Sequence, residues 1–145
     1  IVAQQAITAN DAIFFQETGC HIRDLRVLRL IDDTPGTTFA EIAKITGFER
    51  SLTSRILQNL IGSGLITREN STEDARVFLL STTVKGKEVR QVARRLSDRL
   101  EVILTDPLSA QELRALNEIL ERLGNWVTSE DYGQALALEA DKESI

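Results

Sequence analysis

Apolar residues recur at helical spacing near the start of the chain. Within residues 22–33 an apolar residue stands at every third position, namely Ile22, Leu25, Leu28 and Ile31. Charged residues stand between them, which is the pattern of an amphipathic helix with one buried stripe. Residues 1–18 predict an earlier helix that ends before Gly19, and Pro35 with Gly36 ends the second helix.

The next segment carries a start signal and a stop signal for a short helix. Thr38 and Glu41 have the spacing of a capping box, in which each side chain accepts a hydrogen bond from the other residue's backbone N–H. Gly47 can take the left-handed conformation that ends a helix, because it has no Cβ. The sequence therefore predicts a short helix followed by a tight turn.

A longer helix and two strands follow that turn. The helix runs over about residues 49–63 and ends at Gly64, and its buried stripe comprises Ile56, Leu57 and Leu60. Short aliphatic runs at residues 65–68 and 77–81 predict two strands around a polar loop. This order of elements is a helix-turn-helix with a wing.

One face of the helix at residues 49–63 is polar and rich in donors suited to phosphates and base edges. The candidate DNA contacts on this helix are Arg50, Ser51, Leu52, Thr53, Ser54, Arg55 and Gln58. In the wing, Arg68 is a candidate phosphate contact and Arg76 a candidate for a narrow minor groove. In an extended segment, the Asp74 carboxylate would orient the Arg76 guanidinium. The alternatives are a solvated helix face and a plain surface ion pair.

Two long amphipathic helices follow the wing. Between residues 84 and 104 the apolar stripe comprises Val89, Val92, Leu96, Leu100 and Ile103. The next helix opens with a capping box at Ser109 and Glu112, and its apolar seam comprises Leu113, Leu116, Leu120, Leu123 and Val127. These helices hold more apolar surface than a domain this small can cover, which predicts a symmetric homodimer.

These patterns predict a single domain over residues 1–145, mainly α with a small two- to three-stranded β-wing. A winged helix-turn-helix lobe for DNA binding occupies residues 20–90. A helical dimerisation region comprises residues 1–19 and 91–127. We interpret residues 128–145 as an acidic C-terminal tail, with a frayed helix as the alternative.

The distribution of charge favours a nucleic-acid partner, although the formal net charge is −5. Residues 38–95 hold 10 basic and 6 acidic side chains, whereas residues 96–145 hold 4 and 11. The positive charge therefore lies on the predicted DNA-reading segment. The sequence has no apolar run long enough for a membrane span and no signal-peptide pattern, so the cytoplasm is the expected location.

Residues 19–127 resemble the MarR family (multiple antibiotic resistance regulators) of winged helix-turn-helix proteins. The matching residues, in the family's order and spacing, are Gly47-Phe48-Glu49-Arg50-Ser51, Ser54-Arg55, Gly64-Leu65-Ile66, Arg68, Asp74, Arg76 and Lys85-Gly86. The resemblance implies a homodimeric repressor that binds double-stranded DNA at an inverted-repeat operator and is released by a small aromatic or lipophilic effector. Phe14, Phe15 and His21 are the candidate lining of an effector pocket; the alternative places both phenylalanines in the core.

Two departures from the family's pattern bear on DNA recognition. Leu52 and Thr53 stand in the reverse of the usual order, which is a small polar residue and then an apolar one. We therefore expect a different base preference. In the wing, Ala75 replaces a second arginine and Glu73 adds negative charge, which is expected to weaken the wing's hold on DNA.

Cys20, next to His21, is the remaining candidate for chemistry. An imidazolium beside the thiol would lower the thiol's pKa and make Cys20 an oxidant sensor, whereas a buried cysteine would be inert packing. One cysteine and one histidine are too few for a metal site, and no cofactor is expected. The sequence shows no nucleophile–base pair and no glycine-rich phosphate loop, so we expect no enzyme. The alternative function is a winged-helix protein-interaction module without sequence-specific DNA binding.

Overall fold

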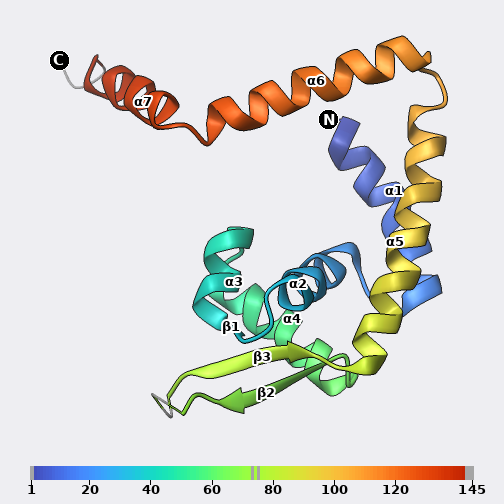
Figure 1. Ribbon diagram of the computed structural model, residues 1–145, viewed down its shortest axis with the longest axis vertical. Coiled ribbons are helices and arrows are strands. Elements are labelled where there is room, and N and C mark those ends of the chain that lie inside the picture. Colours follow the sequence, from blue (N-terminus) through green and yellow to red (C-terminus); the bar gives the residue numbers. More distant parts are fainter. Residues whose placement is uncertain (1, 73, 75, 143–145) are drawn as a thin grey trace. The chain divides into compact units, whose positions relative to one another are not determined.

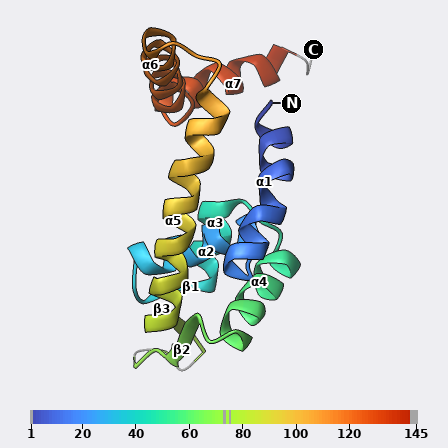
Figure 2. The ribbon, with the colours of Figure 1, turned by 90° about the vertical axis from the view of Figure 1, so that its right-hand side faces the viewer.

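The computed structural model describes residues 2–72, 74 and 76–142 and divides into two compact units (Figure 1, Figure 2). Unit 1 comprises Ile1–Glu101 and unit 2 comprises Val102–Ile145. The DNA-binding lobe proposed at residues 20–90 falls wholly within unit 1. The departures from the family's pattern at Glu73 and Ala75 lie outside the described residues.

Four helices precede the wing strands in unit 1. They are α1 (Val2–Thr18), α2 (Ile22–Asp33), α3 (Phe39–Thr46) and α4 (Arg50–Gly62). The residues that follow α1 and α3, Gly19 and Gly47, have φ of 71° and 67°, and Gly64 after α4 has φ of 70°. These values lie in the left-handed region that favours glycine, so the predicted helix ends are confirmed.

Both predicted capping boxes are confirmed. The Thr38 hydroxyl accepts a hydrogen bond from the Glu41 N–H at 3.3 Å, and the Glu41 carboxylate accepts one from the Thr38 N–H at 2.7 Å. The corresponding distances at Ser109 and Glu112 are 3.3 and 2.8 Å, at the start of helix α6 (Ala110–Val127). These hydrogen bonds satisfy backbone donors that the first turn of a helix leaves free.

The wing belongs to a three-stranded antiparallel sheet in the order β1-β3-β2. Its strands are β1 (Thr37–Thr38), β2 (Ile66–Asn70) and β3 (Phe78–Thr82). Thr37 and Arg68 both pair with Leu80 of the central strand. Strand β3 therefore connects the segment before α3 to the wing strand β2.

The core of unit 1 is built from the apolar stripes that the sequence predicted. Leu28, Ile31 and Ile42 are fully buried, and Leu60 is 2% exposed. Figure 1 shows α2, α3 and α4 gathered against the sheet. A smaller cluster joins α1 to helix α5 (Val84–Thr105), where Phe14 packs with Ala93 and Leu96.

The start of helix α5 packs closely against the backbone of Leu65 at Gly86. A Cβ atom on Gly86 would lie 2.1 Å from the carbonyl oxygen of Leu65. Just before it, the Thr83 hydroxyl donates hydrogen bonds to the carbonyl oxygens of Gly64 and Leu65 at 2.7 and 3.2 Å. The start of α5 is thereby fixed against the turn between α4 and β2.

Unit 2 contains the last residues of α5, helix α6 and helix α7 (Glu130–Lys142). Helix α6 has no buried residue, and its predicted seam is open: Leu120 is 55% exposed and Leu123 53%. The rings of Trp126 and Tyr132 meet edge to face with centroids 5.8 Å apart, which joins α6 to α7. Within unit 2, therefore, α6 leaves an apolar face uncovered.

Within the acidic segment, α7 covers Glu130–Lys142, which favours the helical alternative for this part of the chain. The Ser129 hydroxyl accepts a hydrogen bond from the Tyr132 N–H at 3.2 Å. Glu130 and Asp131 then occupy the first turn of α7, where negative side chains interact favourably with the helix dipole. The acidic composition therefore supports a helix start here.

Candidate nucleic-acid interface

Helix α4 presents one polar row to solvent. Ser51, Arg55 and Gln58 are exposed at spacings of four and three residues, which places them on one side of the helix. Arg50 is also exposed and Ser54 is half-buried. The opposite side packs into the core through the predicted stripe, whose members are at most 6% exposed. This helix is therefore held firmly by one face while the other is free to enter a groove.

Thr53 does not belong to the contact surface that the sequence predicted. Its side chain is fully buried, and its hydroxyl donates a hydrogen bond to the carbonyl oxygen of Glu49 at 3.1 Å. The hydroxyl is the one polar atom of the Thr53 side chain, and this hydrogen bond gives it a partner in spite of its burial. Leu52 is half-buried and packs against the core. Thr53 is thus a core residue, and the sequence missed this because threonine is common on both kinds of surface.

Two of the candidate arginines lie against aromatic rings. The guanidinium carbon of Arg50 lies 5.8 Å from the centroid of the Phe39 ring, and that of Arg68 lies 4.9 Å from the Phe78 ring. Both are within the range of cation–π attraction. Such contacts limit the rotamers of the arginines and leave their N–H groups free for phosphate oxygens.

The wing turn orders Arg76 through its backbone. The Asp74 carboxylate accepts a hydrogen bond from the Arg76 N–H at 2.9 Å, and the carbonyl oxygen of Asp74 accepts one from the Val77 N–H at 2.9 Å. The predicted carboxylate–guanidinium contact is not among the ion pairs of the described residues. The reason is that this segment is a turn, in which an aspartate readily accepts from the residue two positions on. The exposed Arg76 guanidinium is therefore not neutralised by Asp74.

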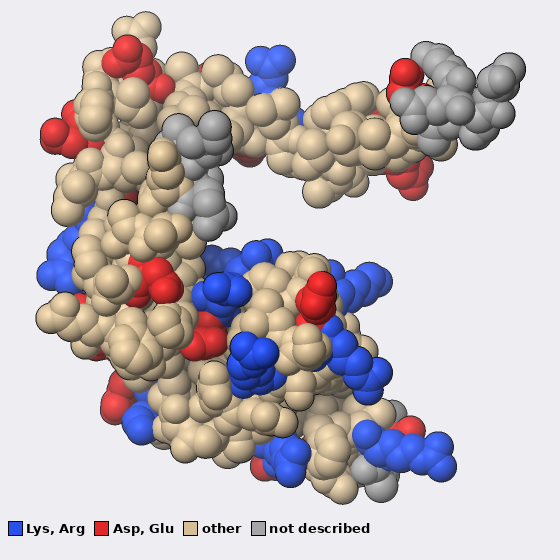
Figure 3. All heavy atoms as spheres, turned by 180° about the vertical axis from the view of Figure 1, so that it is seen from behind, with Lys and Arg blue, Asp and Glu red and all other residues tan. Residues whose placement is uncertain are grey.

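The basic side chains of the lobe lie on its outer surface. Figure 3 shows lysine and arginine side chains gathered over the winged helix-turn-helix, including at the wing. This basic surface agrees with the composition of residues 38–95, which hold 10 basic and 6 acidic side chains. A positive surface of this kind attracts the phosphate backbone of DNA.

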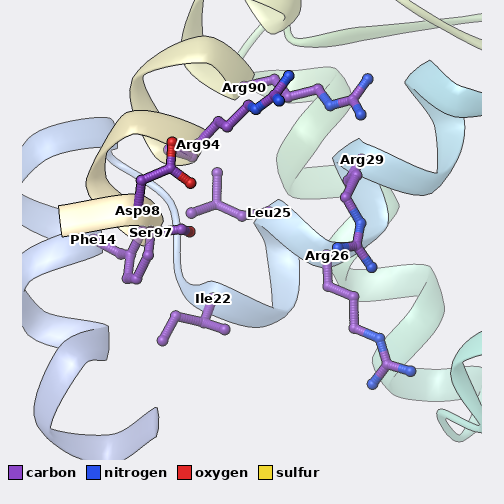
Figure 4. A pocket seen from close by; sticks show the side chains of 10 residues that line it. Phe14, Ile22, Leu25, Arg26, Arg29, Arg90, Arg94, Ser97 and Asp98 are labelled. Atoms are coloured by element: carbon purple, nitrogen blue, oxygen red, sulfur yellow. The ribbon is translucent and has the colours of Figure 1, made fainter. Parts of the chain in front are cut away.

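A cavity of about 520 Å³ lies in unit 1 among α1, α2 and α5 (Figure 4). Its apolar wall comprises Phe14, Ile22, Leu25 and Ala93, and its polar wall comprises Arg26, Arg29, Arg90, Arg94, Ser97 and Asp98. Four arginines against one aspartate give the cavity a positive character. These arginines are not among the residues predicted from the sequence, although Arg26 and Arg29 lie three residues apart on α2 and so share one face of it.

Of the three residues predicted to line an effector pocket, the structure places only Phe14 at the cavity. Phe15 and His21 are not part of its lining; their rings stack on each other with centroids 4.6 Å apart. The Nδ1 atom of His21 lies 2.7 Å from the Asp11 carboxylate, whose other oxygen accepts a hydrogen bond from the Ile22 N–H at 2.8 Å. His21 therefore helps join α1 to the start of α2.

The surroundings of Cys20 favour inert packing over an oxidant-sensing role. Its side chain is 6% exposed and belongs to the core cluster. Burial raises the pKa of the Cys20 thiol, the Asp24 carboxylate raises it further, and Lys85 opposes them. A raised pKa keeps the thiol protonated, and the thiolate is the form that reacts.

We accordingly expect Cys20 to resist alkylation in the folded protein. Iodoacetamide at mildly alkaline pH should modify it far more slowly than in protein unfolded with guanidinium, because the folded thiol is both protonated and covered. Intact-mass spectrometry over time measures both rates. Equal rates in the two states would show that the thiol is accessible and ionised.

Two kinds of feature are absent from the part of the chain that the structure describes. No helix in it is both long and apolar enough to cross a membrane. No group of three or more His, Cys, Asp or Glu residues in it could hold a metal ion.

Comparison with known proteins places the chain among bacterial transcriptional regulators. The MarR family model matches residues 19–77. The HTH-type transcriptional regulator YgaV of Escherichia coli is 30% identical over 97 residues, which span 67% of this chain and 93% of that protein. The HTH-type transcriptional regulator BilQ of Clostridium symbiosum is 25% identical over 109 residues, which span 75% and 76%.

Solved structures show the same fold. The crystal structure of MarR has a TM-score of 0.78 at 22% identity, with 85% of this chain and 92% of that chain covered. The transcriptional regulator SlyA has a TM-score of 0.74 at 23% identity, with 92% and 93% covered. A mutant MarR from E. coli complexed with operator DNA has a TM-score of 0.70 at 21% identity, with 83% and 89% covered.

Proposed function

The chain belongs to the MarR family of DNA-binding transcriptional regulators, and on that premise we propose that it is a homodimeric repressor released from an inverted-repeat operator by a small effector. The observation that carries this proposal is the exposed row of Ser51, Arg55 and Gln58 on α4, beside a wing in which the Arg76 guanidinium forms no ion pair among the described residues. A groove-reading helix and a cationic wing are the two parts that such recognition needs.

In the proposed complex, α4 lies in the major groove and the wing reaches the adjacent minor groove. Arg55 and Gln58 are suited to base edges, since arginine pairs with guanine and glutamine with adenine. Arg50 and Arg68 contact phosphates, and Arg76 enters the minor groove. A two-fold dimer would place its two α4 helices about one turn of DNA apart, roughly 34 Å, which is why the operator is expected to be an inverted repeat.

The homodimer is supported by the apolar surface that a single chain leaves open. Along α6, Ile119, Leu120, Leu123 and Trp126 are each between 46% and 55% exposed. Monomeric soluble proteins rarely expose apolar side chains in such a continuous row. A second copy, meeting the first about a two-fold axis, would cover the same face on both chains.

The cavity among α1, α2 and α5 is the candidate effector site. Its apolar wall would receive a ring or aliphatic body, and its arginines would bind an acidic group through two parallel hydrogen bonds. The favoured effector class is therefore a small organic acid with an apolar body. Such a ligand releases DNA only when it binds the non-DNA-binding arrangement of the protein better than the DNA-binding one.

The proposal is tested by fluorescence anisotropy on duplexes that tile the region upstream of the protein's own gene, at about 150 mM salt with competitor DNA. One fragment containing an inverted repeat should bind tightly. Arg76→Ala should weaken that binding about thirtyfold, because a dimer loses two contacts of about 1 kcal/mol each. Arg55→Ala should weaken it comparably and also change the preferred sequence.

Arg99→Ala is the matched control, since it removes the same charge from an exposed position of α5. It should change the affinity far less than either interface variant. If no fragment is preferred in this assay or in a genome-wide selection, and Arg76→Ala changes nothing, the protein-interaction module becomes the better account of this fold.

A further inference from the structure

Arg90 belongs to two groups of residues at once. It lines the cavity together with Arg94, and both side chains extend from α5 (Figure 4). Its guanidinium also forms ion pairs with the carboxylates of Asp32 and Asp33 at the end of α2. Arg94 and Arg29 form no ion pair among the described residues. Arg90 is thus the cavity arginine whose charge is already engaged.

The two carboxylates stand where a cation is needed. Asp32 and Asp33 are the last two residues of α2, at the negative end of the helix dipole, and the last turn of α2 contains no basic residue. The Asp32 side chain is 15% exposed. Burial by itself would lower the pKa of Arg90, but the hydrogen bonds that its guanidinium donates to both carboxylates outweigh burial and raise that pKa. Arg90 therefore neutralises the negative charge of Asp32 and Asp33, for which α2 has no basic residue in its last turn.

The end of α2 leads directly into the DNA-reading elements. Two residues after Asp33, the chain turns, and the Gly36 N–H donates a hydrogen bond to the carbonyl oxygen of Leu80 in the wing strand β3 at 2.8 Å. Thr37 then pairs with Leu80, and Thr38 caps α3. The segment after Asp33 thus connects the end of α2 to both the wing sheet and α3. If the ion pairs between Arg90 and the end of α2 weaken, we expect this segment to shift, and the wing and α3 with it.

We infer that Arg90 is shared between the Asp32–Asp33 pair and an anion bound in the cavity, so that an acidic effector loosens α5 from the end of α2. The inference rests on the proposed effector cavity and adds the contact through which that cavity acts. An anion near Arg90 attracts the guanidinium and repels the two carboxylates, and both effects weaken the ion pairs. The apolar wall of the cavity fixes the rest of the ligand.

Thermodynamic reciprocity makes this inference testable without DNA. If ligand binding weakens the hold of Asp32 and Asp33 on Arg90, then removing those carboxylates must strengthen ligand binding by the same coupling factor. A structural role of the ion pairs alone predicts no such gain. A gain of affinity on removal of two residues outside the cavity lining is therefore the diagnostic result.

The experiment is isothermal titration calorimetry with naphthoate, an aromatic carboxylate, and with its neutral amide, naphthamide. Asp32→Asn with Asp33→Asn should bind naphthoate about three- to fivefold more tightly than wild type, the range expected for a partly exposed ion pair. Arg90→Gln should bind naphthoate more weakly. Naphthamide should bind all three proteins alike, since it carries no charge to compete for Arg90.

Two control proteins locate the effect. Glu49→Gln with Glu69→Gln removes the same charge from exposed positions outside the cavity lining and should leave naphthoate affinity unchanged. Ser97→Phe fills part of the cavity from an exposed position and should abolish binding. If the double aspartate variant loses its circular-dichroism signature, Asp33→Asn alone, at a side chain 51% exposed, should show a smaller gain in the same direction.

The outcomes separate the inference from the proposal beneath it. In one outcome, Ser97→Phe abolishes naphthoate binding but the aspartate substitutions leave it unchanged. That result would overturn the sharing of Arg90, while the proposed effector site would stand. An equal gain for naphthamide would overturn the sharing too, because the effect would not depend on charge. No binding to any of these proteins would overturn both, while DNA recognition by α4 and the wing would stand.

Discussion

Gly86→Ala is expected to lower the free energy of unfolding by about 3 kcal/mol. The new Cβ would lie 2.1 Å from the carbonyl oxygen of Leu65, which is a backbone atom and cannot rotate away. In an open helical position the same substitution would stabilise by up to about 1 kcal/mol, through the greater helix propensity of alanine. The steric clash is the larger effect here, because relieving it requires moving either α5 or the start of β2. Chemical denaturation followed by circular dichroism measures the difference.

Gly62→Ala is the matched control, because a Cβ at this position in α4 has no atom within 4 Å. It should leave stability unchanged or raise it slightly. If both variants were equally stable, α5 would be free to shift by more than 1 Å at its start without cost. That result would also contradict the close packing of this helix start, where Lys85 Nζ donates a hydrogen bond to the carbonyl oxygen of Ser63 at 2.8 Å.

Features that depend on residues close in sequence were predicted well. The capping boxes at Thr38 and Ser109 join residues three positions apart, and the glycine stops act on a single residue's backbone. The helical stripes likewise need only the periodicity of one segment. Gly86 is an intermediate case: the family resemblance includes it, but its physical reason is the approach of Leu65, which only the fold shows.

Features that depend on packing between distant segments were not predicted. Arg90 and Asp32 are 58 positions apart, and no local pattern connects them. The cavity joins three helices, so no local pattern distinguishes Phe14, which lines it, from its neighbour Phe15, which does not. Thr53 was misassigned because the two faces of α4 meet there, and a threonine satisfies the buried side by bonding back to Glu49. At such boundaries composition does not decide which face a residue joins.

Introducing charge into the α6 seam is expected to have the largest effect on DNA binding. Leu120→Glu with Leu123→Glu should convert the proposed dimer to monomer and weaken operator binding by about a hundredfold or more, since two linked half-sites bind far more tightly than one. Each dimer would lose four leucine contacts of about 2 kcal/mol each and would have to desolvate four carboxylates. Sedimentation equilibrium and operator anisotropy measure the two effects on the same samples.

The fold of unit 2 should survive these substitutions, because α6 has no buried residue. Gln111→Glu with Asn125→Glu adds the same two charges to the opposite face of α6 and should leave both the dimer and DNA affinity intact. If the seam variant stayed dimeric, the dimer interface would not lie on α6. A seam variant that becomes monomeric yet binds the operator as tightly as wild type would show that one α4 helix and one wing are sufficient, and the inverted repeat would then have no role.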